Sequence, residues 1–180
     1  ITNGTAASTE SKRYANLVAD WWEAKFPAVN VTLVNAGIGG TGSDIGTFRV
    51  QKDLLSKEPD FIVIEFSVND AQGALAEKMM EGLVRQILSD TNYPGAMLLL
   101  LKQSNGTTAQ VSHKLVADYY DVPYVSFADM IDTAVSHDGI SLASIFTDGL
   151  HPNDVGMAYI AEFINRELES IYNNLPADGQ

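Results

Sequence analysis

The amino-acid sequence predicts an α/β protein in which a parallel sheet is covered by helices on both faces. Two features lead to this prediction: helical and strand patterns alternate along the chain, and two strand candidates are almost wholly apolar. Strands that alternate with helices pair in parallel, and a strand with few polar positions is buried on both of its faces. The two apolar candidates are residues 61–66 and 96–101.

The first half of the chain opens with an amphipathic helix that ends at Pro27, because proline cannot continue the helical hydrogen bonding. Ser43 or Asp44 has the short polar side chain that caps the start of a second helix. The spacing of apolar residues sets the remaining elements. In order, we expect helix 14–26, strand 29–34, glycine-rich loop 35–42, a helix to about residue 56, strand 61–66 and helix 71–89.

The second half repeats this alternation. In order, we expect strand 96–101, helix 107–120, strand 123–126, helix 127–135, loop 138–153 and helix 154–173. We therefore treat residues 1–180 as one domain with a three-layer, doubly wound parallel sheet of the flavodoxin-like type. Such a sheet has one more strand in its centre, before Tyr14, and we expect this first central strand to be missing from residues 1–180.

Composition narrows the classes of function. Acidic residues outnumber basic ones 23 to 11, and the resulting charge of −12 repels phosphate backbones and anionic lipids, so neither nucleic acid nor a membrane is an expected partner. The chain has no cysteine, which excludes disulfides and thiolate chemistry. Its longest apolar run, residues 96–101, is too short to cross a bilayer. A secreted and a cytoplasmic location both agree with this composition.

Asp148 and His151 are the first candidates for catalytic chemistry. A serine nucleophile needs a base that accepts its proton, and the base needs a carboxylate that orients its ring. An Asp and a His three residues apart, in a loop before the last helix, can supply both groups. An ordinary loop, in which Asp148 caps a turn and His151 lies in solvent, explains the four-residue pattern as well.

Asn69 follows the apolar strand 61–66, at the end where ligands bind in parallel sheets. Its side-chain amide can donate to a developing oxyanion, although an Asx turn explains it equally well. The loop 35–42 carries Gly40, whose main-chain N–H is a second candidate donor. Glycines 37, 39 and 42 in this loop also match a dinucleotide-binding fingerprint, but the acidic residue that should follow is poorly placed.

Other polar residues have simpler explanations. Glu65 lies inside an apolar strand, where it must be hydrogen-bonded or neutral, and it more plausibly holds a loop than acts as a base. Ser43 fits a helix cap better than a nucleophile. His113 and His137 lack the spacing of metal ligands, so we expect no metal site.

Together these segments resemble the SGNH (GDSL) hydrolases, a family recognised by four blocks that carry Ser, Gly, Asn and Asp-x-x-His in this order. The resemblance spans nearly the whole chain, and the matching blocks are residues 1–4, 35–40, 68–70 and 148–151. Ser67 departs from the family pattern, which commonly has glycine there. The family's nucleophilic serine is expected immediately before Ile1, outside residues 1–180.

The resemblance implies a serine esterase that forms an acyl-enzyme intermediate and needs no cofactor. It assigns Asp148 and His151 to the catalytic triad, and Gly40 and Asn69 to the oxyanion hole. The sequences of residues 39–44 and 65–70 resemble the matching blocks of bacterial members that deacetylate carbohydrates. We therefore expect small acyl esters, above all acetylated saccharides, as substrates. Two alternatives remain: a relative that binds sugars or esters without cleaving them, and a nucleotide-binding α/β protein.

Overall fold

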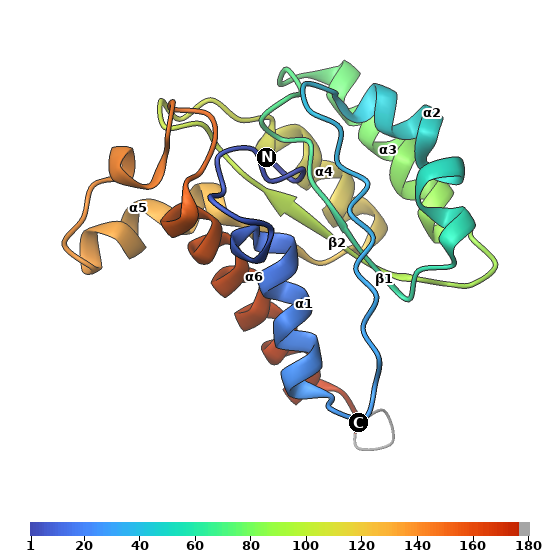
Figure 1. Ribbon diagram of the computed structural model, residues 1–180. Helices are drawn as coiled ribbons and strands as arrows, with labels where there is room; N and C mark the ends of the chain where they lie inside the picture. Colours follow the sequence, from blue (N-terminus) through green and yellow to red (C-terminus); the bar gives the residue numbers. More distant parts are fainter. Residues whose placement is uncertain (177–180) are drawn as a thin grey trace.

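The computed structural model describes residues 1–176 and has the predicted α/β architecture (Figure 1). Its parallel sheet has three strands in the order β1-β2-β3, namely β1 (Phe61–Ile64), β2 (Gly95–Leu100) and β3 (Tyr124–Ser126). Phe61 lies opposite Gly95 in the first pair, and Leu98 lies opposite Tyr124 in the second. All three strands therefore end at the same edge of the sheet, the edge at which parallel sheets bind ligands.

The central strand β2 is buried on both faces, as its apolar sequence predicts. Met97 and Leu99 belong to one hydrophobic cluster, and Leu98 and Leu100 belong to the other. All four side chains are at most 1% exposed. Because successive side chains of a strand point to opposite faces, β2 is the common wall of two separate cores.

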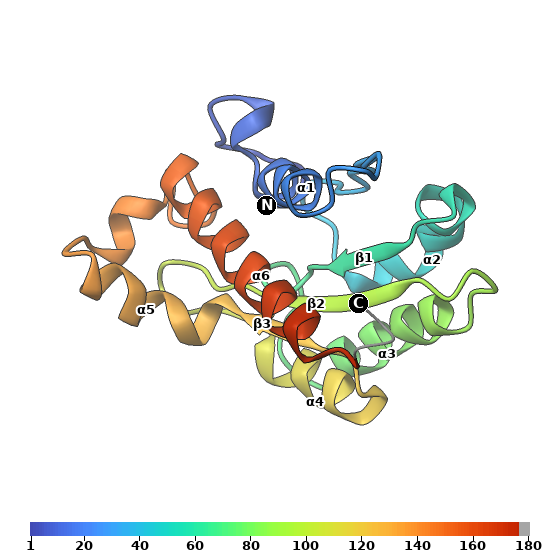
Figure 2. The same ribbon diagram turned by 90° about the horizontal axis from the view of Figure 1, so that it is seen from below.

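Helices cover both faces of the sheet and give three layers (Figure 2). One face carries α1 (Tyr14–Lys25), α5 (Phe127–His137) and α6 (Asp154–Asn174). The other carries α2 (Ser43–Asp53), α3 (Ala74–Leu88) and α4 (Gln110–Tyr120). Within residues 1–176, 3₁₀ turns at Glu10–Lys12, Leu55–Lys57 and Leu142–Ile145 complete the elements. Among residues 1–176, no helix combines the length and the apolar character that spanning a membrane requires.

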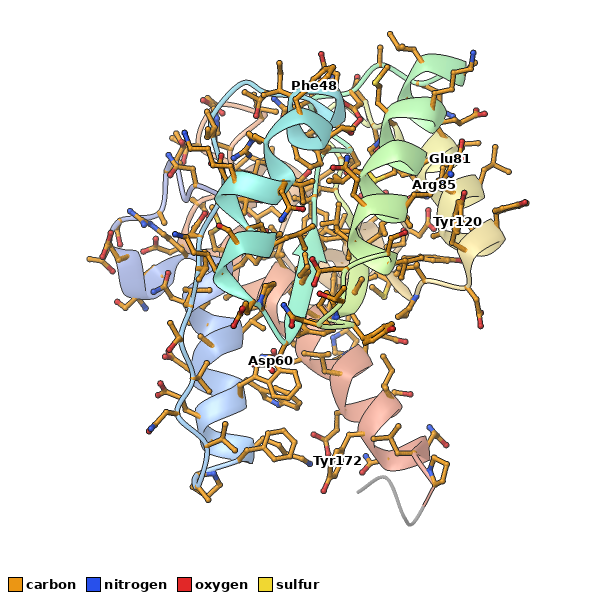
Figure 3. All side chains as sticks on the ribbon, turned by 90° about the vertical axis from the view of Figure 1, so that its right-hand side faces the viewer. Phe48, Asp60, Glu81, Arg85, Tyr120 and Tyr172 are labelled. Atoms are coloured by element: carbon orange, nitrogen blue, oxygen red, sulfur yellow. The ribbon has the colours of Figure 1, made fainter. Side chains whose placement is uncertain are left out.

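Polar side chains join neighbouring helices at the surface of both layers. Lys25 on α1 pairs with Glu169 on α6 at 2.7 Å. Tyr120 on α4 donates to Glu81 on α3 at 2.8 Å, and the two residues lie at the side of the molecule seen in Figure 3. Partly exposed contacts of this kind add little stability each, so the apolar clusters carry the fold.

The structure confirms the predicted helices and the strands at 61–66, 96–101 and 123–126, with ends that differ by at most three residues. The predicted strand 29–34 is wrong. These residues form an extended, largely exposed segment that runs beside β1 (Figure 1). No backbone hydrogen bond connects residues 30–36 with a strand in the described part of the chain, and a strand exists only with such a partner.

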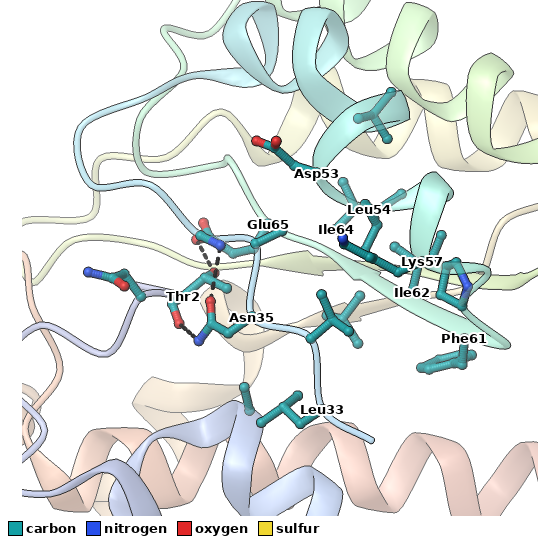
Figure 4. A pocket seen from close by; sticks show the side chains of 18 of the residues that line it. Thr2, Leu33, Asn35, Asp53, Leu54, Lys57, Phe61, Ile62, Ile64 and Glu65 are labelled. Atoms are coloured by element: carbon teal, nitrogen blue, oxygen red, sulfur yellow. Dashed lines mark hydrogen bonds between the residues drawn. The ribbon is translucent and has the colours of Figure 1, made fainter. Parts of the chain in front are cut away.

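A cavity of about 640 Å³ separates this extended segment from the free edge of β1. Leu33 lines it on one side, and Ile62 and Ile64 line it on the other (Figure 4). Leu33 remains 41% exposed although its side chain is apolar. The fold thus presents an apolar slot between β1 and residues 30–36.

The predicted cap of α2 is also wrong. Gly42 occupies the cap position, Ser43 is the first helical residue, and no side chain of the cap residue accepts a helical N–H. The N–H of Ser43 instead donates to the side chain of Asp70, 27 residues further along the chain. A contact between distant segments therefore replaces the local cap.

Ser67 connects the end of β1 with the end of β2. Its hydroxyl accepts from the N–H of Leu101 at 2.7 Å and donates to the carbonyl of Leu101 at 3.0 Å. The side chain is fully buried. This double hydrogen bond gives a physical reason for serine where the family pattern commonly has glycine.

We predict that Ser67→Ala lowers the free energy of unfolding by about 1–3 kcal/mol, because it leaves a buried main-chain N–H without an acceptor. Urea denaturation measures the change. Ser144→Ala is the matched control, since Ser144 also donates to a main-chain carbonyl but in an exposed turn. An equal loss of unfolding free energy in the two variants would contradict the stabilising role of the Ser67 hydrogen bonds.

Candidate active site

Asp148 and His151 lie in a short closed loop that leads into α6. Phe146 and Pro152 form an antiparallel bridge, and the N–H of Thr147 donates to the carbonyl of His151 at 2.9 Å. The side chain of Asn153 accepts from two N–H groups in the first turn of α6 and so caps this helix. Both sides of the loop are therefore fixed, which limits the positions that the two side chains can take.

The loop brings the carboxylate and the imidazole together as the sequence predicts. Asp148 Oδ2 lies 2.8 Å from His151 Nδ1, and Asp148 Oδ1 accepts from the N–H groups of His151 and Leu150 at 2.8 and 3.1 Å. These hydrogen bonds, of which the main-chain bond from His151 is the strongest influence, lower the pKa of Asp148 to about 2. An ionised Asp148 accepts a hydrogen bond from Nδ1–H, so Nε2 of a neutral His151 has a free lone pair.

The candidate oxyanion donors lie on two other loops. Asn69 sits in a tight turn after β1, where its N–H donates to the carbonyl of Phe66 at 3.0 Å. Gly40 lies in the loop before α2 with φ +72°, a conformation that strongly favours glycine. Both residues are exposed, and both line the cavity beside β1. Asp148 and His151 are not among the residues that line this cavity.

The N-terminal segment connects these parts of the site. The side chain of Asn35 donates to the carbonyl of Thr2 at 2.8 Å, which holds residues 1–4 against the glycine-rich loop (Figure 4). Ser8 donates through its N–H and its hydroxyl to Asp154, at the start of α6. Residues 1–8 therefore lead from the cavity to the helix that follows His151.

Glu65 is held at the inner end of this segment. The hydroxyl of Thr2 donates to Glu65 Oε2 at 3.3 Å and is also hydrogen-bonded to the hydroxyl of Tyr14 at 2.8 Å. Burial raises the pKa of Glu65 and, with Glu65 nearby, also that of Tyr14. Glu65 thus contacts the N-terminal loop, in agreement with its predicted role of holding a loop.

The glycine loop lacks the surroundings of a dinucleotide site. It follows no strand in the described structure, because residues 29–34 are not part of the sheet. The nearby acidic residue, Asp70, accepts from Ser43 and lies 2.8 Å from His113, so it is engaged within the protein. Among residues 1–176, no three side chains of His, Cys, Asp or Glu gather as metal ligands.

Sequence reasoning missed the contact between Asp70 and His113. The two residues are 43 positions apart, and His113 is only 1% exposed. The signal that could have found them is a titratable side chain on a buried helix face: His113 lies on α4 with the buried residues Val116 and Ala117. A buried histidine of this kind requires a polar partner.

We predict that Glu65→Gln raises the melting temperature at pH 8 but not at pH 4. Because the folded pKa is raised, the stability that Glu65 contributes is complete below its unfolded pKa of about 4.3 and declines as the pH rises. Removing the charge should therefore gain about 2–4 °C at pH 8, the effect of about 1 kcal/mol in a protein of this size.

Glu169→Gln is the control, for which we expect the opposite change in melting temperature at pH 8. Its hydrogen bond with Lys25 lowers the pKa of Glu169, so its contribution is present above the unfolded pKa and is lost at low pH. The control should therefore lose stability at pH 8. Calorimetry of both variants at the two pH values tests the sign, and a lower melting temperature for Glu65→Gln at pH 8 would contradict the prediction.

Comparison with known proteins agrees with the sequence blocks and the fold. The model of the GDSL-like lipase/acylhydrolase family matches residues 1–159. Thioesterase 1/protease 1/lysophospholipase L1 of Escherichia coli K12 is 25% identical over 173 residues, which are 91% of this chain and 77% of the relative. An arylesterase of Vibrio mimicus is 24% identical and covers 77% of this chain and 70% of its own.

Solved structures give the same result. The crystal structure of a two-domain esterase active on acetylated mannans is 40% identical with a TM-score of 0.90, covering 94% of this chain and 46% of its own. The chain thus spans about half the length of that esterase. An acetylxylan esterase of Geobacillus stearothermophilus, at 20% identity and a TM-score of 0.73, shares the fold over 86% of this chain and 80% of its own. The chain belongs to the GDSL-like lipase/acylhydrolase family, also called the SGNH hydrolases.

Proposed function

We propose that this chain belongs to a serine esterase that hydrolyses small acyl esters. The observation that carries the proposal is the pair of Asp148 and His151, with an ionised carboxylate 2.8 Å from Nδ1 and a free lone pair on Nε2. This is the arrangement that a serine nucleophile requires of its base. The esterases and thioesterase among its relatives support the same reaction class.

In the proposed mechanism, a serine immediately before Ile1 attacks the ester carbonyl while His151 Nε2 accepts its proton. Asp148 stabilises the resulting imidazolium. The N–H of Gly40 and the side-chain amide of Asn69 donate to the oxyanion of the tetrahedral intermediate. His151 then protonates the leaving alcohol. Water then attacks the acyl-enzyme carbonyl while His151 accepts its proton, and His151 returns this proton to the serine oxygen as the acid leaves.

We propose that residues 1–180 belong to one domain whose sheet includes a further parallel strand before Ile1. The slot between β1 and residues 30–36 supports this, because it has the free edge of β1 on one side and an extended segment on the other. A strand in the slot would pair with both neighbours and cover apolar side chains such as Leu33. It would also end at the edge of the sheet where Gly40 and Asn69 lie.

Acetylated saccharides are the substrates that we propose. The support is the 40% identity with an esterase active on acetylated mannans, which extends over 94% of this chain. The net charge of −12 agrees with a neutral rather than an anionic polymer, because like charges repel.

We predict that the native protein is labelled once by a fluorophosphonate probe and releases acetate from acetylated mannan oligosaccharides. Intact mass spectrometry counts the label. His151→Ala should lower kcat/KM at least about 10³-fold, because the serine loses its base. The matched control is His137→Ala, which removes an exposed histidine that also contacts an aspartate, Asp138, at 3.0 Å. Binding of the oligosaccharides without label or acetate release would instead indicate a non-catalytic relative.

We also predict the acid limb of the pH profile. Because the pKa of Asp148 is about 2, this carboxylate stays ionised down to about pH 4, so only protonation of the general base limits the proposed reaction on the acid side. The logarithm of kcat/KM should therefore fall with a slope of one as the pH is lowered to about 4. A slope of two in that range would mean that a second group, such as Asp148, titrates there as well.

A further inference from the structure

The two proposed oxyanion donors depend on a contact between their loops. Gly40 precedes α2, whereas Asn69 follows β1, and both are exposed. An oxyanion hole works only when its donors hold fixed positions, and an error of about 1 Å can cost about 100-fold in rate. The geometry around Asp70 supplies such a constraint.

Asp70 joins the two loops directly. It follows Asn69 in the chain, and its Oδ1 accepts from the N–H of Ser43 at 2.8 Å, three residues after Gly40. A Cβ atom at Gly42 would lie only 2.5 Å from the same oxygen, so the close approach requires glycine there. A carboxylate at this place also faces the positive end of α2.

His113 holds Asp70 from the opposite side. Its Nε2 lies 2.8 Å from Asp70 Oδ2, the side of the carboxylate that Ser43 leaves free. The side chains of Asp70 and His113 are 8% and 1% exposed. Burial by itself would raise the pKa of Asp70, but the hydrogen bonds from His113 and Ser43 outweigh it and lower the pKa. Asp70 is therefore an ionised acceptor shared by two donors.

The start of α4 also fixes the two ends of the turn that carries Asn69. The N–H of Ala109 donates to the carbonyl of Ser67 at 2.7 Å. The hydroxyl of Ser112 accepts from the N–H of Gly73 at 2.9 Å. Together with His113, one turn of α4 thus contacts the segment 67–73 at its beginning, its middle and its end.

We infer that Asp70 and His113 are positioning residues, which set the side chain of Asn69 at a fixed distance from the N–H of Gly40 by linking their loops through Ser43. This inference rests on the proposed esterase function, because it concerns the geometry of the same site. We expect neither side chain to contact substrate, because His113 is only 1% exposed and both oxygens of Asp70 already accept hydrogen bonds.

A double-mutant cycle tests the inference in the native protein. Asp70→Ala should lower kcat about 10- to 100-fold, the cost of a misplaced donor, and change KM less than about threefold. Asn69→Ala should lower kcat about 10²- to 10³-fold. If Asp70 acts through Asn69, Asp70→Ala should cost clearly less in the Asn69→Ala background. If Asp70→Ala lowered kcat by the same factor with and without Asn69→Ala, the inference would be overturned.

Conservative variants separate positioning from folding. Asp70→Asn keeps an acceptor for Ser43 and should restore part of kcat relative to Asp70→Ala. His113→Gln keeps a donor for Asp70 and should retain more activity than His113→Leu. As a matched control, Asp129→Asn alters a carboxylate that accepts from Gln110 at 2.7 Å at the start of α5, and it should leave kcat unchanged.

Hydrogen exchange of the Ser43 amide tests the link between the loops without any activity. It should be faster in Asp70→Ala than in the wild type, while the amide of Asp129, which donates to Ser126, should exchange equally in both. If the wild-type protein hydrolyses no ester, the proposed function fails, and this measurement still decides whether Asp70 holds α2. Unchanged exchange at Ser43 would overturn the inference even in an active esterase.

Discussion

Burial of β2 on both faces is the constraint on which the rest of the structure depends. Alternate side chains of this strand belong to two separate cores, so a shift by one residue would exchange them and place every side chain in the wrong layer. With β2 fixed, its parallel neighbours end at one edge of the sheet. The loop after β2 then reaches the loop that carries Asp148 and His151, since the N–H of Ser104 donates to the carbonyl of Gly149 at 2.8 Å. The turn with Asn69 starts from the same edge.

The sequence predicted well what depends on neighbouring residues. Helices follow from the spacing of apolar side chains within a few turns, and the contact between Asp148 and His151 spans only three positions. The failures share one cause. Residues 29–34 have strand composition, but a strand is a property of a pair, and these residues pair with no strand in the described chain. Ser43 resembles a cap, but its N–H donates to a carboxylate 27 residues away.

The contacts that give the site its shape could not be read from the sequence, because they join distant segments. Ser67 reaches the main chain of Leu101 across 34 positions, and Asp70 reaches His113 across 43. Neither pair has a spacing that any local rule describes. The sequence indicated only that polar residues follow a buried strand. Burial then makes such contacts obligatory, because a polar group removed from water without a partner costs about 1–3 kcal/mol or more.

Two pairs of aspartate and histidine occur in the candidate site, and their surroundings differ. Each aspartate also accepts a main-chain N–H, and in each the hydrogen bonds lower the pKa. The side chains of Asp148 and His151 are 54% and 26% exposed, so this pair is open to solvent, as the proposed proton transfers require. Asp70 and His113 are enclosed, and His113 already uses Nε2 for Asp70. In the proposed mechanism, the same two functional groups therefore move protons where solvent and substrate can enter, whereas in the enclosed pair they hold the main chain in place.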